Sequence, residues 1–301
     1  MNISLVDVDG HNFPNLALMK ISAWHKAAGD TVNWYEPLFS DPDIIYASKV
    51  FTFTPDYEYY SPDAPEPIKG GTGYDLKKEL PEEIEKMLPD YSIYPAWKTA
   101  IGFLSRGCIR KCAWCIVPEK EGEIHIVDDI ERVAAGRHEV TLMDNNFLAN
   151  PEDFVLDQLQ KAQRLGFRID FNQALDARLI TEKTAKCLAR TKWIKYIRFA
   201  CDTESMLEPV KRAVKMIQEF GYNGQFFVYV LAKYVQETHE RIKKLCSISE
   251  KIYPFCQPYR NFDTNEPPDK QLQNLARWCN YQAIRKTVSW DNYRYNQENG
   301  K

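Results

Sequence analysis

Three cysteines lie close together in this chain, at Cys108, Cys112 and Cys115, and their spacing is Cys-x3-Cys-x2-Cys. Thiolates bind zinc and iron–sulfur clusters, and a closed structural site usually has a fourth Cys or His nearby. The closest His, His125, follows Cys115 by ten residues. The spacing therefore predicts a metal cluster with three protein ligands and one iron left open. A zinc knuckle completed by a distant residue, and a chance grouping, are the alternatives.

Length and the amino terminus indicate the compartment of these thiols. A chain of 301 residues can bury a sizeable core without disulfides, so we do not expect a disulfide framework. The first residues, Met1 to Asp7, lack the basic region and apolar stretch of an export signal. We therefore expect a cytoplasmic protein whose thiols are reduced.

Composition points to no particular partner, with 44% hydrophobic and 27% charged residues. The 39 basic and 42 acidic side chains give no overall attraction to nucleic acid, and no run of about 18 apolar residues is present to span a membrane. A basic stretch from Lys183 to Lys195 could meet RNA phosphates, but it lies on and after a predicted helix that needs a solvated face. We expect no membrane partner, while an RNA substrate stays open.

Alternating strand and helix patterns organise the larger part of the chain. The predicted strands are 100–104, 139–143, 167–171, 193–199, 225–231 and 251–255. One intervening helix is expected to begin at Asn150-Pro151 and to end at Gly166. Such repeated βα units predict an α/β fold with parallel strands, whose functional loops gather at the carboxyl ends of the strands.

The cysteine segment, residues 102–115, resembles the cluster loop of the radical S-adenosylmethionine (SAM) enzymes. The likeness includes Trp114 before the last cysteine and Arg106-Gly107 before the first. Together with the six βα units, it extends over roughly residues 99 to 260. The resemblance implies a partial (β/α)6 barrel in which the three cysteines hold a four-iron four-sulfur (4Fe-4S) cluster and SAM chelates the open iron.

A function follows from the same resemblance. In that family, one electron from the cluster cleaves SAM to methionine and a 5′-deoxyadenosyl radical, which abstracts hydrogen from a substrate. The resemblance thus implies an enzyme with a flavodoxin- or ferredoxin-type reductant as its partner. It identifies neither the substrate nor the reaction after hydrogen abstraction. The alternative from a different class is a non-catalytic iron–sulfur or zinc-binding protein.

The resemblance also implies which side chains contact SAM. Asp144, Asn145 and Asn146 follow the second strand, at the position near the SAM amino group in the family, and their oxygens suit an ammonium. Asn172, after the third strand, is a candidate for the SAM ribose or the substrate. Arg198, on the fourth strand, is the candidate for the SAM carboxylate, which a guanidinium binds with two hydrogen bonds.

Other polar residues in this region receive structural interpretations. Asp176 and Arg178, shortly after Asn172, are predicted to form a pair at the mouth of the barrel. The remaining cysteines lack ligand spacing and are predicted to be buried apolar residues rather than ligands of a second cluster. They are Cys187, Cys201, Cys246, Cys256 and Cys279.

Residues 1–95 are predicted to form a small Rossmann-like α/β domain. It resembles a shortened cobalamin-binding domain at Asp9-Gly-His11, Ser48-Lys49-Val50 and Gly70-Gly71. Pro14 stands where that motif has Gly, and Pro lacks the freedom and the N–H that a close approach to a ligand uses. The departure favours a vestigial scaffold or a substrate-recognition role, with His11 as a loop residue. Bound cobalamin, and with it a cobalamin-dependent radical methylase, is the less favoured alternative.

The predicted organisation therefore has three parts. The Rossmann-like domain occupies 1–95, the barrel 96–262, and a carboxyl-terminal helix with its tail 263–301. The helix is expected from about Lys270 to Ile284, packed against the barrel, and the polar tail from Ser289 is expected to be frayed.

Overall fold

The computed structural model describes residues 1–10, 12–262, 264 and 266–298. The chain divides into two compact units, Met1–Ile101 and Gly102–Lys301, close to the predicted boundary after residue 95. Each unit combines parallel β-sheet with α-helices, so the mixed α/β class is confirmed. The segment predicted as a separate third part belongs to the second unit.

The first unit contains a four-stranded parallel sheet of order β2-β1-β3-β4. Its elements are β1 (Asn2–Asp7), α1 (Leu16–Ala27), β2 (Thr31–Trp34), β3 (Ile44–Ser48), β4 (Ile68–Gly70), α2 (Glu82–Glu85) and the 3-10 helix η1 (Tyr91–Ile93). Asn15 caps α1 by accepting a hydrogen bond from the Leu18 N–H, and Gly29 follows the helix with a φ of 85°. The predicted parallel pairing is confirmed.

The second unit holds two parallel sheets and a short antiparallel hairpin. The sheet orders are β10-β9-β8-β5 and β11-β12-β13, and β6 pairs with β7. The strands are β5 (Ala100–Gly102), β6 (Ser105–Arg106), β7 (His125–Ile126), β8 (Glu139–Leu142), β9 (Arg168–Phe171), β10 (Lys192–Trp193), β11 (Ile197–Ala200), β12 (Phe226–Ala232) and β13 (Ile252–Pro258). A parallel bridge between Leu175 and Phe199 links the two sheets.

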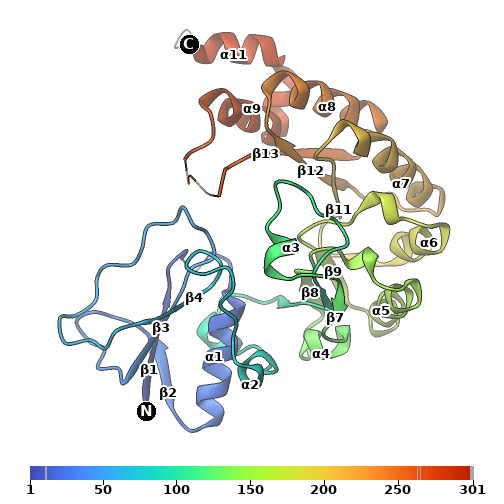
Figure 1. Ribbon diagram of the computed structural model, residues 1–301. Helices are drawn as coiled ribbons and strands as arrows, with labels where there is room; N and C mark the ends of the chain where they lie inside the picture. Colours follow the sequence, from blue (N-terminus) through green and yellow to red (C-terminus); the bar gives the residue numbers. More distant parts are fainter. Residues whose placement is uncertain (11, 263, 265, 299–301) are drawn as a thin grey trace. The chain divides into compact units, whose positions relative to one another are not determined.

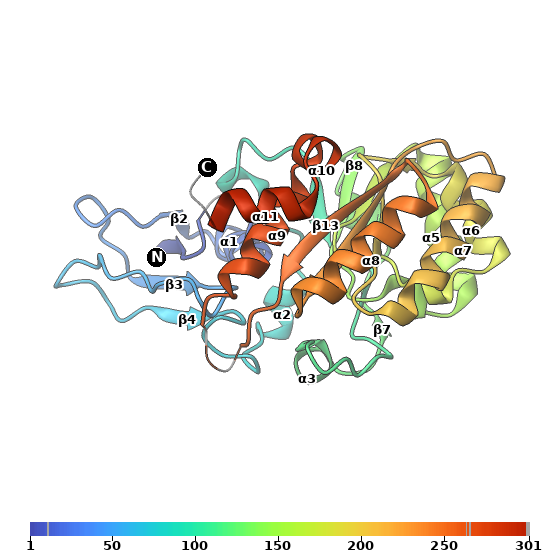
Figure 2. The same ribbon diagram turned by 90° about the horizontal axis from the view of Figure 1, so that it is seen from above.

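Helices follow one another around these strands in an arc, as Figure 1 shows. Each helix from α4 to α9 contacts the next, and Figure 2 shows α8 and α9 beside β13. The helices are α3 (Val117–Lys120), α4 (Ile130–Ala134), α5 (Glu152–Leu165), α6 (Glu182–Arg190), α7 (Leu207–Glu219), α8 (Val235–Ile248), α9 (Lys270–Asn280), α10 (Gln282–Thr287) and α11 (Trp290–Glu298), with 3-10 helices η2 (Phe147–Ala149), η3 (Ala177–Leu179) and η4 (Glu204–Met206).

The strand predicted over 193–199 is wrong as a single element. Lys192 and Trp193 pair with β9, whereas residues from Ile197 onward pair with β12. An unbroken apolar run does not reveal that its two ends hydrogen-bond to different sheets. Because of this interruption, β11 belongs to the sheet β11-β12-β13. Arg198 therefore lies in a different sheet from the residues of β9.

Two predicted helix ends also differ. Pro151 occupies the N-cap position of α5, while the Asn150 amide donates to the Ser105 hydroxyl and the Phe147 carbonyl. The helix expected from 270 to 284 is interrupted at Tyr281, and the tail expected to fray forms α11. Trp290 explains this last difference, because its ring is 3% exposed and its burial anchors the helix.

None of the helices formed by the described residues is both long enough and apolar enough to cross a bilayer.

Candidate functional site

The three cysteines occupy one loop that begins after β6 and ends at α3. The Cys108 N–H donates to the Gly122 carbonyl (3.2 Å), and the Cys115 N–H to the Cys112 carbonyl (3.0 Å). Gly107, just before the loop, has a φ of 83°, and an added Cβ would lie 2.2 Å from the Glu123 carbonyl oxygen. Only glycine fits there, so the backbone itself fixes where the cysteine loop starts.

The thiols of this loop interact electrostatically, but they are not arranged around a common metal position. Burial raises the pKa of Cys112, and the Arg178 guanidinium counteracts this. Cys115 interacts with both other thiols. Nevertheless, in the described part of the chain no three His, Cys, Asp or Glu side chains are grouped closely enough to hold a metal ion. A metal would therefore have to gather the three sulfur atoms as it binds.

Asp144, predicted to contact SAM, lies at the end of β8 and holds the strand that leads into the cysteine loop. It is 1% exposed and accepts hydrogen bonds from Leu104 N (3.1 Å), Ser105 N (2.7 Å) and Ser105 Oγ (2.7 Å). Burial raises the pKa of Asp144 to about 6, although these hydrogen bonds favour its charged form. Both carboxylate oxygens thus have partners within the protein.

The raised pKa predicts a measurable pH effect. Because the folded state holds the Asp144 proton more tightly than the unfolded state, this group's contribution to stability is full below about pH 3.8 and is lost as pH rises through about 6. Between pH 4 and pH 7, wild type should lose about 2 kcal/mol relative to Asp144→Asn in the free energy of unfolding. Urea unfolding of both apo-proteins across this range measures the difference, and a difference that is independent of pH would contradict the expectation.

The two asparagines that follow Asp144 contact the start of the cysteine loop. The Asn145 side-chain oxygen accepts from the Gly107 N–H (2.9 Å), and the Asn146 amide donates to the Cys108 sulfur (3.3 Å). Asn146 is 4% exposed, and its side-chain oxygen is buried without a hydrogen-bond partner among the described residues. An unpaired buried acceptor is unfavourable, so this oxygen beside Cys108 can accept a hydrogen bond from a further donor.

Arg198 and Asn172, also predicted for SAM, lie together on β11 and at the end of β9. Arg198 Nε and Nη2 bind the Asp170 carboxylate (2.6 and 2.7 Å), and Nη1 donates to the Tyr229 hydroxyl (3.1 Å). The fork predicted to bind a carboxylate therefore already binds one of the protein's own. The Asn172 side-chain oxygen, by contrast, is buried without a hydrogen-bond partner in the part of the chain that the structure describes.

The predicted pair of Asp176 and Arg178 is confirmed, at 2.7 Å between Arg178 Nε and the carboxylate. Arg110, from the cysteine loop, binds the same carboxylate through its Nε (3.1 Å). Asp176 therefore joins the segment after β9 to the loop between Cys108 and Cys112. The Arg178 guanidinium lowers the pKa of Cys112, but burial outweighs it, so the pKa of this thiol is raised overall.

Asp202, which follows β11, is a further contact of the cysteine loop that sequence reasoning did not single out. It accepts a hydrogen bond from the Leu231 N–H at 3.1 Å, and an electrostatic interaction with the Trp114 indole favours the charged form of its carboxyl. Trp114 lies between Cys112 and Cys115, so Asp202 ties this part of the loop to β11 and β12. An acidic residue directly after a predicted strand was the available signal.

Replacing Asp202 by Asn removes its charge and should weaken this contact, because a neutral amide oxygen is a weaker acceptor than a carboxylate. A hydrogen bond to a charged group is worth about 1.5–3 kcal/mol, so we expect alkylation of Cys112 and Cys115 by iodoacetamide to become about tenfold faster. Peptide mass spectrometry resolves the individual cysteines. Glu204→Gln is the matched control, because it removes the same charge two residues away from an exposed ion pair with Lys244. Equal rates in the two variants would rule out the role given to Asp202.

In open parallel α/β sheets, ligands bind where the strand order reverses. In the first unit this position lies at the carboxyl ends of β1 and β3. Asp9 there accepts hydrogen bonds from the Val50 N–H and the Thr54 hydroxyl (2.6 Å). Lys49, which is 7% exposed, pairs with Asp56. These contacts join the loop after β3 to the segment after β1, while the Thr52 hydroxyl and the Tyr60 hydroxyl in the same loop are buried without a hydrogen-bond partner among the described residues.

The cobalamin-like motif includes the glycine pair Gly70-Gly71. A Cβ on Gly71 would approach the Lys49 carbonyl oxygen to 2.5 Å, so close packing within the unit requires glycine there. A Cβ on Gly70 would meet no described atom within 4 Å. Cobalamin binding and the scaffold interpretation both stay predictions. His11 lies outside the described residues.

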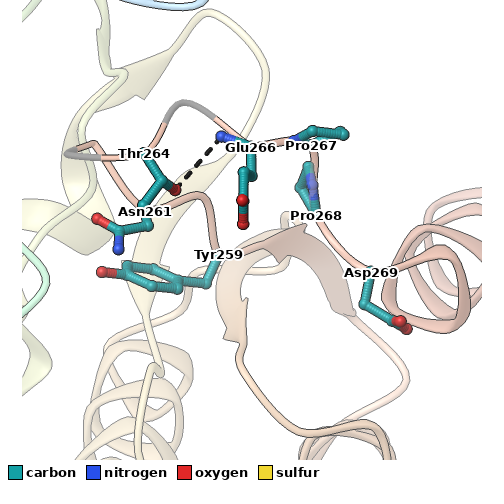
Figure 3. A pocket seen from close by; sticks show the side chains of 7 residues that line it. All are labelled: Tyr259, Asn261, Thr264, Glu266, Pro267, Pro268 and Asp269. Atoms are coloured by element: carbon teal, nitrogen blue, oxygen red, sulfur yellow. Dashed lines mark hydrogen bonds between the residues drawn. The ribbon is translucent and has the colours of Figure 1, made fainter.

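A separate hollow of about 220 Å3 lies between the end of β13 and the start of α9. Figure 3 shows its lining side chains, Tyr259, Asn261, Thr264, Glu266, Pro267, Pro268 and Asp269. Tyr259 also contacts the Lys233 ammonium, which lies 4.5 Å from its ring centroid and 5.0 Å from that of Trp114. The hollow contains none of the site residues predicted from the sequence.

Contacts at the cysteine loop thus bring together the ends of four strands. Residues that follow β8, β9 and β11 hold the loop directly, and β12 is joined to it through Asp202. The donor set fits an iron–sulfur cluster in kind, since it offers three thiols, an N–H donor to one sulfur, and an unpaired acceptor beside it. Comparison of the chain with protein-family models and with curated proteins finds no match.

Proposed function

We propose that this protein is a radical SAM enzyme, in which Cys108, Cys112 and Cys115 hold a 4Fe-4S cluster and SAM binds at its open iron. The single observation that carries the proposal is the site around Asn146. Its amide donates to the Cys108 sulfur, while its oxygen is buried beside it without a partner among the described residues. A cluster ligand and an acceptor for an ammonium group are thus adjacent, as SAM chelation needs.

The arrangement of the strands supports the same proposal. Two parallel sheets are linked by the Leu175–Phe199 bridge and surrounded by helices on one side, which is compatible with a partial (β/α)6 barrel. Functional loops of such folds lie at the carboxyl ends of the strands. The cysteine loop has its contacts with Asp144, Asp176 and Asp202, which all follow strands.

The bound cluster would supply one electron to the SAM sulfonium, giving methionine and a 5′-deoxyadenosyl radical that abstracts hydrogen from a substrate. The chain's own residues have other tasks. Asn146 orients Cys108 and accepts a hydrogen bond from the SAM amino group, Asn145 and Asp144 hold the segment that leads into the loop, and Arg110 fixes the loop through Asp176. A flavodoxin- or ferredoxin-type reductant and a cytoplasmic location, where thiols stay reduced, belong to the proposal.

Anaerobic reconstitution tests the proposal. The protein is purified without oxygen, incubated with iron and sulfide, and supplied with SAM and dithionite. We expect about four iron and four sulfide per chain, as a 4Fe-4S cluster requires, and formation of 5′-deoxyadenosine. A protein that binds zinc tightly but neither retains iron nor binds SAM would instead be a structural metal protein, and the proposal would be abandoned.

A further inference from the structure

Basic side chains gather at the amino ends of the strands β9 and β10. Arg168 and Lys192 are the first residues of these strands and are partners in their parallel pairing. Gln163, near the end of α5, donates hydrogen bonds to the Cys187 carbonyl (2.9 Å) and the Thr191 hydroxyl (3.1 Å) at the end of α6. Figure 2 shows the two helices side by side. We call the exposed cations that converge here the basic face, namely Arg164, Arg168, Lys186, Arg190, Lys192 and Lys195.

Further contacts hold the members of the basic face close together. The Arg168 guanidinium donates to the Ile194 carbonyl (2.8 Å), directly before Lys195. Lys186 and Arg190 are four residues apart on α6, so they lie on the same side of that helix. The sequence shows only the part of this group between 183 and 195, whereas Arg164 and Arg168 join it through the tertiary structure.

The charge of the basic face is largely unneutralised. Arg168 pairs with Glu139, but the other five cations form no ion pair with the described residues. The remaining acidic residues of α5, α6 and β9 are paired or lie away from the ends that carry the basic face; they are Glu152, Asp153, Asp157, Asp170 and Glu182. Because the whole chain has 39 basic and 42 acidic side chains, five unpaired cations in one place create a local positive field.

Local roles explain only part of this arrangement. Arg164 and Arg190 lie in the last turns of α5 and α6, where a cation interacts favourably with the helix dipole. Lys192 lies on the edge strand β10, where a charge discourages pairing with another chain. Lys186 and Lys195 have neither role. None of these local effects requires the five side chains to converge.

The composition of the surface indicates the kind of partner. The centres of protein–protein interfaces are depleted in charged residues and enriched in aromatic ones. Among the described residues of α5, α6, β9 and β10, Leu165 is the one large apolar side chain that is exposed. Interfaces with nucleic acid are much more positively charged, and cations that reach phosphates gain affinity by releasing counterions.

The elements that carry the cations favour double-helical RNA. Proteins that read DNA place a helix or a β-ribbon in the major groove, whereas these cations lie largely at helix ends and beside an edge strand. Sites for single strands add exposed aromatic rings on which bases stack, and the described residues of these elements offer none. Double-helical RNA is recognised largely by its shape and its backbone.

We propose that the basic face binds the phosphate backbone of double-helical RNA without reading its sequence. The five unpaired cations contact phosphates. The basic face lies at the amino ends of β9 and β10, whereas the residues that hold the cysteine loop follow the carboxyl ends of strands. RNA should therefore bind whether or not a cluster is present, and the inference does not depend on the proposed function.

Fluorescence anisotropy tests the proposal with the full chain and no added iron. The probe is a labelled RNA duplex of about 20 base pairs, longer than the roughly 16 that a double-stranded RNA-binding domain spans. We expect a dissociation constant below about 100 μM near 0.1 M salt, and weaker binding as salt is raised. The double variant Lys186→Gln with Lys192→Gln removes two phosphate contacts. It should bind about tenfold more weakly or worse, and the slope of log K against log salt should become shallower by about two.

Lys270→Gln with Lys286→Gln is the matched control. These two lysines are exposed, form no ion pair with the described residues, and lie on α9 and α10. The control loses the same charge away from the basic face, so its affinity should stay within about twofold of wild type. Arg164→Gln with Lys195→Gln repeats the test on other members of the basic face, and circular dichroism confirms that each variant is folded.

Several outcomes would overturn the proposal. Absence of RNA binding by wild type, or equal weakening in the control and in both test variants, would show that the basic face is only a solvated surface. Tighter binding of a DNA duplex of the same sequence would assign the surface to DNA. Competition by polyglutamate as effective as that of unlabelled RNA duplex would identify a surface for acidic protein instead.

Discussion

Replacement of Cys112 by alanine is expected to abolish cleavage of SAM and to leave a soluble, folded apo-protein. Two cysteines do not hold the proposed cluster, and without it no electron reaches the sulfonium. The fold should survive because the Cys112 thiol is only partly buried on a loop, so its removal creates no cavity in the core. Rates of 5′-deoxyadenosine formation should fall below detection, while circular dichroism and the urea midpoint should stay close to wild type.

Cys246→Ala provides the matched control for this loss. Cys246 lies on α8, is exposed, and belongs to no predicted ligand set, so the same substitution there should leave iron content and SAM cleavage unchanged. A Cys112→Ala variant that still cleaves SAM would show that the cluster assignment is wrong. Loss of cleavage in both variants would point to general damage rather than to a missing ligand.

Replacement of Asp170 by asparagine is expected to have the largest effect on stability. Asp170 is 7% exposed and binds the Arg198 guanidinium through both oxygens. Its loss would leave a buried cation without its charge partner, which typically costs about 3–5 kcal/mol. The pair also connects the two parallel sheets of the second unit, so unfolding should become easier throughout that unit. Urea unfolding followed by circular dichroism measures the change.

Two further variants sharpen this prediction. Glu139→Gln breaks the ion pair between Arg168 and Glu139, whose side chains are 47% and 35% exposed, and should change stability by less than about 1 kcal/mol. The double replacement Asp170→Leu with Arg198→Met removes both charges and should recover much of the loss, because buried ion pairs are often replaceable by apolar residues of similar size. An Asp170→Asn variant as mild as Glu139→Gln would refute a special role for the pair.

Local sequence patterns predicted most of the elements. Runs of apolar residues identified the positions of β1, β8, β9, β12 and β13, because such runs are buried whatever their neighbours in the sheet are. Glycines marked the ends of helices, as Gly166 does with a φ of 73°. The paired charges of Asp176 and Arg178 could also be read locally, since they are two residues apart and their side chains meet directly.

The candidate site was predicted less completely. The residues expected to contact SAM do lie near the ends of strands, but the spacing of Arg198 in the sequence could not reveal that Asp170, 28 residues earlier, would bind its guanidinium. Similarly, Asp144 could be recognised as polar and well placed, but not as the acceptor for Leu104 and Ser105. Each such partner lies on another strand, and the pairing between strands decides which side chains meet.

Sequence by itself therefore determined the alternating α/β organisation and the placement of three thiols on a single loop. Both depend on hydrophobic period and residue type, which are local properties. Only the tertiary structure decided which polar groups remain available. Arg198 is engaged by Asp170, whereas the side-chain oxygens of Asn146 and Asn172 are buried without partners in the described part of the chain. Availability depends on contacts between distant segments, and burial makes each unmatched atom energetically significant.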